Sequence, residues 1–141
     1  MGKFPLIVVG AGPAGFCAAV AAARLGIRTL LVEQYGTLGG AMTVGGVPYP
    51  MNFAAGKRQV IGGVGWELMQ RLLEKGWASG RGEPPYGVLD VDIVMTACEM
   101  DAMAQEAGVE LMLNCKLCKA EAENGRVRRA WFAAPEGLIA L

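Results

Sequence analysis

The chain contains no histidine in its 141 residues. Histidine is the commonest general base and the commonest metal ligand in proteins, so imidazole-based catalytic triads are excluded and no metal site is expected. An excess of one charge is also missing, because 13 basic residues balance 13 acidic ones. A net charge of zero gives no electrostatic reason for binding to nucleic acid or to an anionic membrane surface. We therefore expect neither as a partner.

The cysteines also lack the spacing of a disulfide framework; they are Cys17, Cys98, Cys115 and Cys118. Such cysteines are typical of reduced thiols and predict a cytoplasmic protein. Cys115 and Cys118 have the CxxC spacing of redox and zinc motifs. In the strand expected there, however, positions three apart point to opposite faces, and a zinc site needs two further ligands. We expect neither a redox nor a metal role for this pair.

One apolar stretch could be mistaken for a signal peptide or a membrane anchor. Lys3 is followed by an uncharged run over residues 4–23. A membrane-spanning helix needs about 20 mostly apolar residues without a cluster of helix breakers. The run is broken near its middle by Gly10, Gly12, Pro13 and Gly15. We therefore expect no membrane segment here.

The same glycine cluster separates the first elements of a βαβ unit. Residues 4–9 form an apolar run typical of a strand buried on both faces. Residues 16–25 are alanine-rich and helical by propensity, and Gly26 suits the end of that helix. Residues 28–32 predict a second buried strand. This order favours a right-handed crossover between two parallel strands.

Beyond this unit the pattern predicts a looser series of elements. They are a loop over residues 35–56, a helix over 57–75, a loop over 77–89, a helix to residue 107 capped by Asp90 or Asp92, a strand over 109–113, and an antiparallel meander over 115–141 with a hairpin turn at Asn124-Gly125. The chain is 53% apolar and long enough for one domain, residues 1–141. The fold class expected is α/β, with a mainly parallel sheet and a small antiparallel β-meander.

The central motif is Gly10-Ala11-Gly12-Pro13-Ala14-Gly15. The first glycine allows a tight turn, the second lets a pyrophosphate approach the backbone, and the third lets the helix pack close to the strand. The helix that begins near Pro13 directs its free N–H groups and its positive end toward phosphate. The motif predicts a Rossmann-like FAD/NAD(P)-binding fold because it lies between a strand and a helix.

An acid follows the motif at the expected distance. Glu33 lies 18 residues after Gly15 and ends the second expected strand. Its carboxylate can accept hydrogen bonds from the two ribose hydroxyls of the adenosine half of a dinucleotide. An acid at this place also repels a 2′-phosphate, which argues against NADP. The alternative is a strand-end acid that faces solvent.

The run over residues 7–33 resembles the N-terminal fingerprint of flavoproteins with a glutathione-reductase-type FAD domain. Residues 36–43 resemble the second glycine motif of that family, which contacts the pyrophosphate and the ribityl chain. Segments 39–43, 60–63 and 92–111 are most similar to the bacterial FAD-dependent oxidoreductase family. The resemblance implies FAD as cofactor. It also implies binding residues beyond the glycine turn and Glu33, namely Gln34, Gly39, Gly40 and Thr43, with Lys116 and Leu117 near adenine and residues 43–47 near the isoalloxazine.

The chain departs from this family in several places. Thr37 and Ala41 lie near the double glycine, where many members carry flanking arginines, and this difference weakens one expected phosphate contact. The second FAD-binding segment and the substrate domain of the family have no counterpart in these residues. We therefore expect an N-terminal portion of a larger flavoprotein, with apolar surface that could support a homo-oligomer.

Other acidic side chains predict no catalytic pair, and no catalytic residue is assigned. Acids at positions 67, 74, 99, 101, 106, 121 and 123 are expected on solvated helix or strand faces. The function expected is FAD binding within an oxidoreductase of unknown substrate. An NAD-binding dehydrogenase domain and a non-catalytic nucleotide-fold assembly module remain as alternatives.

Overall fold

The computed structural model describes residues 4–141, so Lys3, which precedes the anchor-like run, lies outside the described residues. A parallel sheet occupies the centre, with strand order β1-β2-β7. Its strands are β1 (Leu6–Val9), β2 (Thr29–Val32) and β7 (Glu110–Met112). Helix α1 (Pro13–Arg24) connects β1 to β2. The predicted βαβ unit and the strand over residues 109–113 are therefore confirmed.

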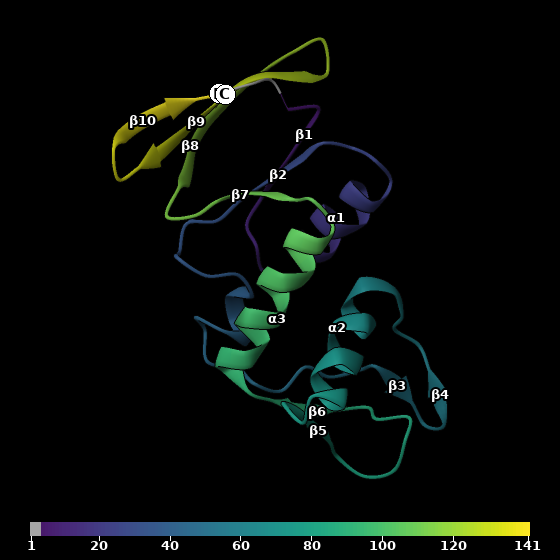
Figure 1. Cartoon of the computed structure of the whole chain (residues 1–141). Helices are drawn as coiled ribbons and strands as arrows, with labels where there is room; N and C mark the ends of the chain where they lie inside the picture. Colours follow the sequence, from purple (N-terminus) through teal and green to yellow (C-terminus); the bar gives the residue numbers. More distant parts are fainter. Residues whose placement is uncertain (1–3) are drawn as a thin grey trace.

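The sheet lies between helices on one face and an antiparallel meander on the other (Figure 1). The alternating side chains of β2 show this arrangement. Leu31 is fully buried in the cluster formed with the helices, whereas Leu30 and Val32 belong to a second cluster around Phe132 of the meander. The second strand was predicted to be buried, and both faces of β2 are covered. The α/β fold class is thus confirmed. The prediction that residues 4–9 form a strand buried on both faces is wrong for β1, whose residues are half-buried except for Val9, which is 47% exposed, because β1 lies at the edge of the sheet.

Two further helices complete the helical layer, α2 (Gly63–Glu74) and α3 (Ile93–Glu106). Apolar side chains from all three helices form the larger core cluster, which includes Phe16, Leu68, Leu72, Met100 and Met103. The Asp92 carboxylate caps α3 by accepting a hydrogen bond of 2.8 Å from the Met95 N–H. One of the two predicted caps is therefore confirmed, because only Asp92 lies where its carboxylate reaches the first turn.

The meander consists of β8 (Lys116–Glu123), β9 (Arg126–Ala134) and β10 (Gly137–Ala140). Adjacent strands pair antiparallel, as expected. Asn124 and Gly125 both adopt positive φ, at 52° and 73°. These values fit the two-residue turn that the sequence predicts.

The middle of the chain differs from the expectation. The helix predicted over residues 57–75 begins only at residue 63, because β3 (Ala54–Ala55) and β4 (Arg58–Gln59) form a small hairpin before it. The predicted loop over residues 77–89 contains β5 (Ala78–Gly80), which pairs with β6 (Leu89–Val91). The loop over 35–56 also contains the short helix η1 (Gly40–Met42). Strands of two or three residues are too short to show a period in the sequence.

Within residues 4–141, no helix is both long enough and apolar enough to cross a lipid bilayer.

Candidate functional site

The glycine turn joins the end of β1 to the start of α1. Gly10 donates its N–H to Val32 O at 2.7 Å, so the turn is attached to the end of β2 as well. The first hydrogen bond of the helix runs from Phe16 N–H to Gly12 O at 2.9 Å. The N–H groups of Ala14 and Gly15 precede that bond and have no partner within the helix. Pro13 and Ala14 are exposed, so this end of α1 is open to a ligand.

Gly15 lies where the helix passes closest to the turn. A Cβ at this position would collide with the carbonyl oxygen of Gly10. Only glycine allows this approach, which is the packing role that the sequence assigns to the third glycine of the motif.

Glu33 directly follows β2, and only 5% of its surface is exposed. Its Oε2 accepts a hydrogen bond of 2.6 Å from Ala11 N–H, and its Oε1 accepts one of 3.0 Å from Tyr35 N–H. A carboxylate has about four acceptor positions, so each oxygen keeps capacity for one more donor such as a hydroxyl. Glu33 is therefore not a solvent-facing acid at a strand end.

The second glycine motif packs directly against the first. Gly39 donates its N–H to Ala11 O at 2.8 Å. A Cβ on Gly40 would lie 2.9 Å from the Cα of Gly12, and Gly40 also has a positive φ of 52°. Ala11 thus links both motifs, since its N–H is bound by Glu33 and its carbonyl by Gly39. The two glycine motifs form one surface at the carboxyl end of the parallel strands, where ligands bind in this fold class.

Thr43 lies close to this surface but its side chain is turned inward. The residue is 6% exposed, and its hydroxyl donates to Leu38 O at 2.6 Å. Thr43 therefore holds the shape of the second glycine motif, with its hydroxyl already used inside the protein.

The start of β8 approaches the same surface through backbone hydrogen bonds. Cys115 N–H donates to Glu33 O at 2.9 Å, and Asn114 N–H donates to Tyr35 O at 3.0 Å. Lys116 and Leu117 follow immediately and are exposed. Gln34 is exposed as well, next to Glu33.

The structure thus brings the glycine turn, Glu33, Gly39 and Gly40 into one site, with Gln34 and the Lys116–Leu117 segment at its edge. Sequence reasoning missed Ala11 and Tyr35 as contributors. Both act through backbone N–H or C=O groups, which every residue type carries except for the missing N–H of proline. The side chains at these two positions therefore carry no signal from which their role could have been predicted.

A cavity of about 260 Å³ lies beside the glycine turn. Pro13 and Met42 line it together with mostly apolar residues of α1, α2 and the loop before β3, including Phe16, Cys17, Pro50 and Phe53. Burial raises the pKa of the Cys17 thiol at its wall, so this cysteine is protonated at neutral pH. Cys17 has the packing role that its place on the helix predicts.

The prediction that all remaining acids lie on solvated faces is wrong for Glu99. This side chain of α3 is 2% exposed and forms ion pairs with Lys75 and with Arg71, whose Nη1 lies 3.3 Å from Oε1. Arg71 also pairs with Glu67 and Glu106. The sequence could not show this burial, because it results from the packing of α2 on α3.

Within the CxxC pair, Cys115 is buried and Cys118 is exposed. Burial raises the pKa of the Cys115 thiol. Across residues 4–141, no group of three potential metal-ligating side chains comes together.

Sequence comparison gives a family match over almost the whole chain. The family of FAD dependent oxidoreductases matches residues 5–141. The thiamine thiazole synthase of Aeropyrum pernix is 35% identical over 127 residues, which cover 86% of this chain and 41% of that protein. The mitochondrial dihydrolipoyl dehydrogenase of Schizosaccharomyces pombe is 48% identical over 48 residues, 33% of this chain and 9% of that protein. The chain therefore spans less than half the length of these relatives.

Solved structures with the same fold match this chain at low sequence identity. CabE, an aromatic hydroxylase of angucycline biosynthesis, has a TM-score of 0.67 at 22% identity, over 99% of this chain and 29% of CabE. THI4 of Thermovibrio ammonificans has a TM-score of 0.63 at 17% identity, over 99% of this chain and 53% of THI4. These likenesses concern the fold, and the family match concerns the sequence. The chain therefore belongs to the FAD dependent oxidoreductase family, and FAD is its cofactor.

Proposed function

We propose that residues 1–141 form the FAD-binding domain of an oxidoreductase and that the assembled glycine surface holds the dinucleotide. The pyrophosphate would lie at the start of α1, over Gly10, Gly12, Pro13, Ala14 and Gly15. The adenosine ribose would bind Glu33, beside Gln34. The ribityl chain would follow Gly39, Gly40 and Thr43, and adenine would meet the backbone at Lys116 and Leu117.

The single observation that carries this proposal is the convergence of three features on Ala11. Glu33 binds its N–H at 2.6 Å, Gly39 binds its carbonyl at 2.8 Å, and the free N–H groups of α1 begin three residues later. A buried carboxylate with spare acceptor positions suits a diol, and unpaired helix N–H groups suit phosphate. The side-chain-free face of Gly12 leaves room for a polyanion near the backbone, and Gly40 lets the second glycine motif pack against Gly12.

FAD, when bound, accepts and donates the electrons of the reaction, while the protein binds and orients it. The residues described here supply the binding and orientation. Thr43 contributes by holding the loop, because its hydroxyl is bound to Leu38 O. No residue described here is proposed to bind the substrate or to act as a catalytic residue.

We also propose a cytoplasmic location and a capacity to self-associate. The four cysteines are all free thiols, as expected in a reducing compartment. Several large apolar side chains between η1 and α2 are exposed, namely Val44, Val47, Tyr49, Met51, Val60 and Ile61. An exposed apolar surface favours association between copies. Light scattering across a concentration series tests this, and a monodisperse monomer at all concentrations would contradict it.

The test of the cofactor site is an FAD titration followed by visible absorbance, with Glu33→Ala as the main variant. We expect saturable uptake of FAD by the unmodified chain. Loss of the Glu33 carboxylate should weaken binding by about 1–3 kcal/mol, because the ribose hydroxyls lose their acceptor. Glu136→Ala, on the exposed turn before β10, is the matched control and should bind FAD as the parent does.

Circular dichroism should accompany the titration, because Glu33 also binds two backbone N–H groups. A folded Glu33→Ala variant with unchanged FAD affinity would remove the ribose contact from the proposal. A folded parent chain that binds NAD but no FAD would contradict the FAD site as a whole.

A further inference from the structure

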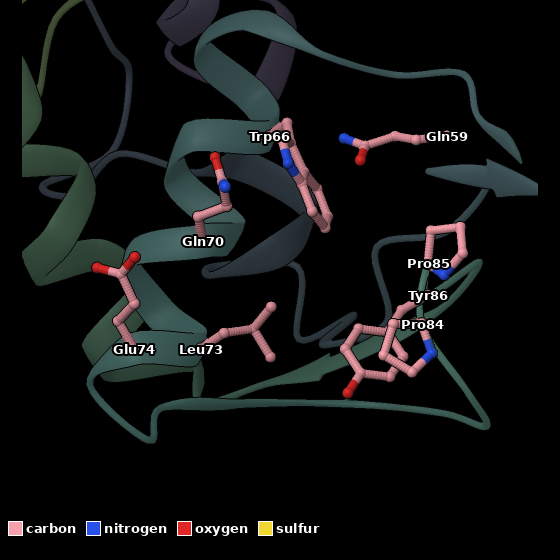
Figure 2. A pocket seen from close by; sticks show the side chains of 8 residues that line it. All are labelled: Gln59, Trp66, Gln70, Leu73, Glu74, Pro84, Pro85 and Tyr86. Atoms are coloured by element: carbon pink, nitrogen blue, oxygen red, sulfur yellow. The ribbon is translucent and has the colours of Figure 1, made fainter.

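A second and larger cavity lies on the outer side of α2, away from the glycine turn. Its volume is about 510 Å³, within the range of small-molecule sites. Figure 2 shows α2 along one side, with Gln59 of β4 and the segment 84–86 along the other. None of the residues that line it belongs to the proposed FAD site.

The aromatic walls of this cavity are held in place from behind. The Trp66 ring packs against the buried Phe53, with 5.5 Å between the ring centroids. The Tyr86 ring lies directly on Gly80, where any Cβ would collide with it. Leu73 and the two prolines 84 and 85 complete the apolar lining. Aromatic faces fixed in this way offer their negative quadrupole to a ligand without first losing side-chain freedom.

The polar groups that line the cavity favour a positively charged ligand. Glu74 is the only charged residue among those that line it, and it lies at the end opposite Gln59 (Figure 2). Gln59 donates one side-chain N–H to Ile61 O at 2.9 Å, which leaves its amide oxygen as an acceptor and its second N–H as a donor. Gln70 and Tyr86 add neutral polar groups. The cavity therefore combines a carboxylate, hydrogen-bond acceptors and aromatic faces.

Two cationic side chains close in sequence to residues that line the cavity, Lys75 and Arg81, form ion pairs elsewhere. Lys75 pairs with Glu99 and lies over the Trp77 ring, with Nζ 4.9 Å from the centroid. Arg81 pairs with Asp90 at 2.5 Å. Neither lines the cavity, so neither neutralises it from within.

We propose that this cavity binds a small organic cation, an ammonium group that carries an apolar body. The ammonium group is attracted by the Trp66 and Tyr86 faces and by the Glu74 carboxylate, and the apolar body contacts Leu73 and the prolines. An anionic ligand would meet Glu74, and no lysine or arginine is among the residues that line the cavity. The site is independent of the FAD site, so it can be tested whether or not FAD is bound.

The test compares choline with its uncharged isostere, in which a tert-butyl group replaces the trimethylammonium group. The chain has three tryptophans, so three indole N–H resonances report on three places in proton–nitrogen correlation spectra. Trp66→Phe identifies the Trp66 resonance. Phosphate buffer avoids competing amines. We expect choline to shift the Trp66 resonance saturably and to bind about tenfold tighter than the isostere.

Glu74→Gln and Glu136→Gln form a matched pair of variants, because both positions are exposed and each change removes one negative charge. Glu74→Gln should lower choline affinity by about threefold to tenfold, and Glu136→Gln should leave it unchanged. Equal affinity for choline and the isostere would overturn the proposal. A static Trp66 resonance throughout the titration, or equal effects of the two variants, would also overturn it.

Discussion

Glu33 and Glu99 are both almost fully buried carboxylates, but different kinds of groups surround them. Glu33, at the end of β2, is held by the backbone N–H groups of Ala11 and Tyr35. Glu99, on α3, is held by the cationic side chains of Arg71 and Lys75. A backbone N–H leaves the charge of the acid available to a ligand, whereas a cation neutralises it. The same degree of burial therefore accompanies the ribose contact that we propose for Glu33 and a structural ion pair between α2 and α3.

The glycine turn beside Glu33 should be the more sensitive of the two regions. Gly15→Ala would force a Cβ against Gly10 O, and the helix would have to move away from β1. We expect the free energy of unfolding to fall by about 3 kcal/mol, the upper part of the range for overpacking. Urea denaturation measures this change. A loss below that of Glu99→Ala would reverse the order of the two regions.

The ion pair between α2 and α3 should come next. Glu99→Ala leaves Arg71 and Lys75 without their buried partner, although both cations keep partial access to water. We expect a loss of about 2 kcal/mol in the free energy of unfolding, with FAD affinity unchanged. Glu106→Gln removes an exposed partner of Arg71 and should have no measurable effect. An FAD affinity that falls with Glu99→Ala would contradict the separation between the two carboxylates.

Gly12→Ala separates binding from stability at the glycine turn. A Cβ at Gly12 would meet no protein atom within 4 Å, so the fold should tolerate it. The added methyl group would occupy the space that we assign to the pyrophosphate, and FAD affinity should fall about tenfold. Gly62→Ala, at the N-cap of α2, is the matched control because its Cβ is equally free. Equal FAD affinities for the two variants would contradict the phosphate assignment.

The smallest effect should come from the exposed part of the helix network. Hydrogen bonds from Arg24 lower the pKa of Glu67 below its ordinary value. Such a carboxyl stabilises the fold above the ordinary glutamate pKa of about 4.3, and the stabilisation disappears as the pH falls through the lowered pKa. Solvent screening limits the effect to about 0.5 kcal/mol. Denaturation at several pH values should show it in the parent and not in Glu67→Gln, and high salt should reduce it.

The sequence predicts those parts of the fold and of the site in which the backbone conformation or a close contact requires a particular residue type. Gly15 is required because no side chain fits against Gly10 O, and Asn124-Gly125 is required because both residues need positive φ. The role of Glu33 follows from its distance along a short βαβ unit. The contacts of Ala11 could not be predicted, because they use backbone groups that carry no sequence signal.

The middle of the chain was harder to predict for a different reason. Strands β3 to β6 contain two or three residues each and form because their partners lie beside them. For example, two backbone N–H groups of β6 donate hydrogen bonds to the carbonyl oxygens of Pro48 and Pro50, which lie far from β6 in the chain. Glu99 shows the same dependence, since its surroundings arise only when α2 packs on α3.

Residue types alone therefore specify the β1-α1-β2 unit, its glycine turn and its acid, because these depend on local backbone conformation and on short separations along the chain. Tertiary packing decides the burial of Glu99, the contact between the two glycine motifs and the aromatic cavity beside α2. Each of these brings together groups from separate elements, and their contact energy exists only once the chain has folded.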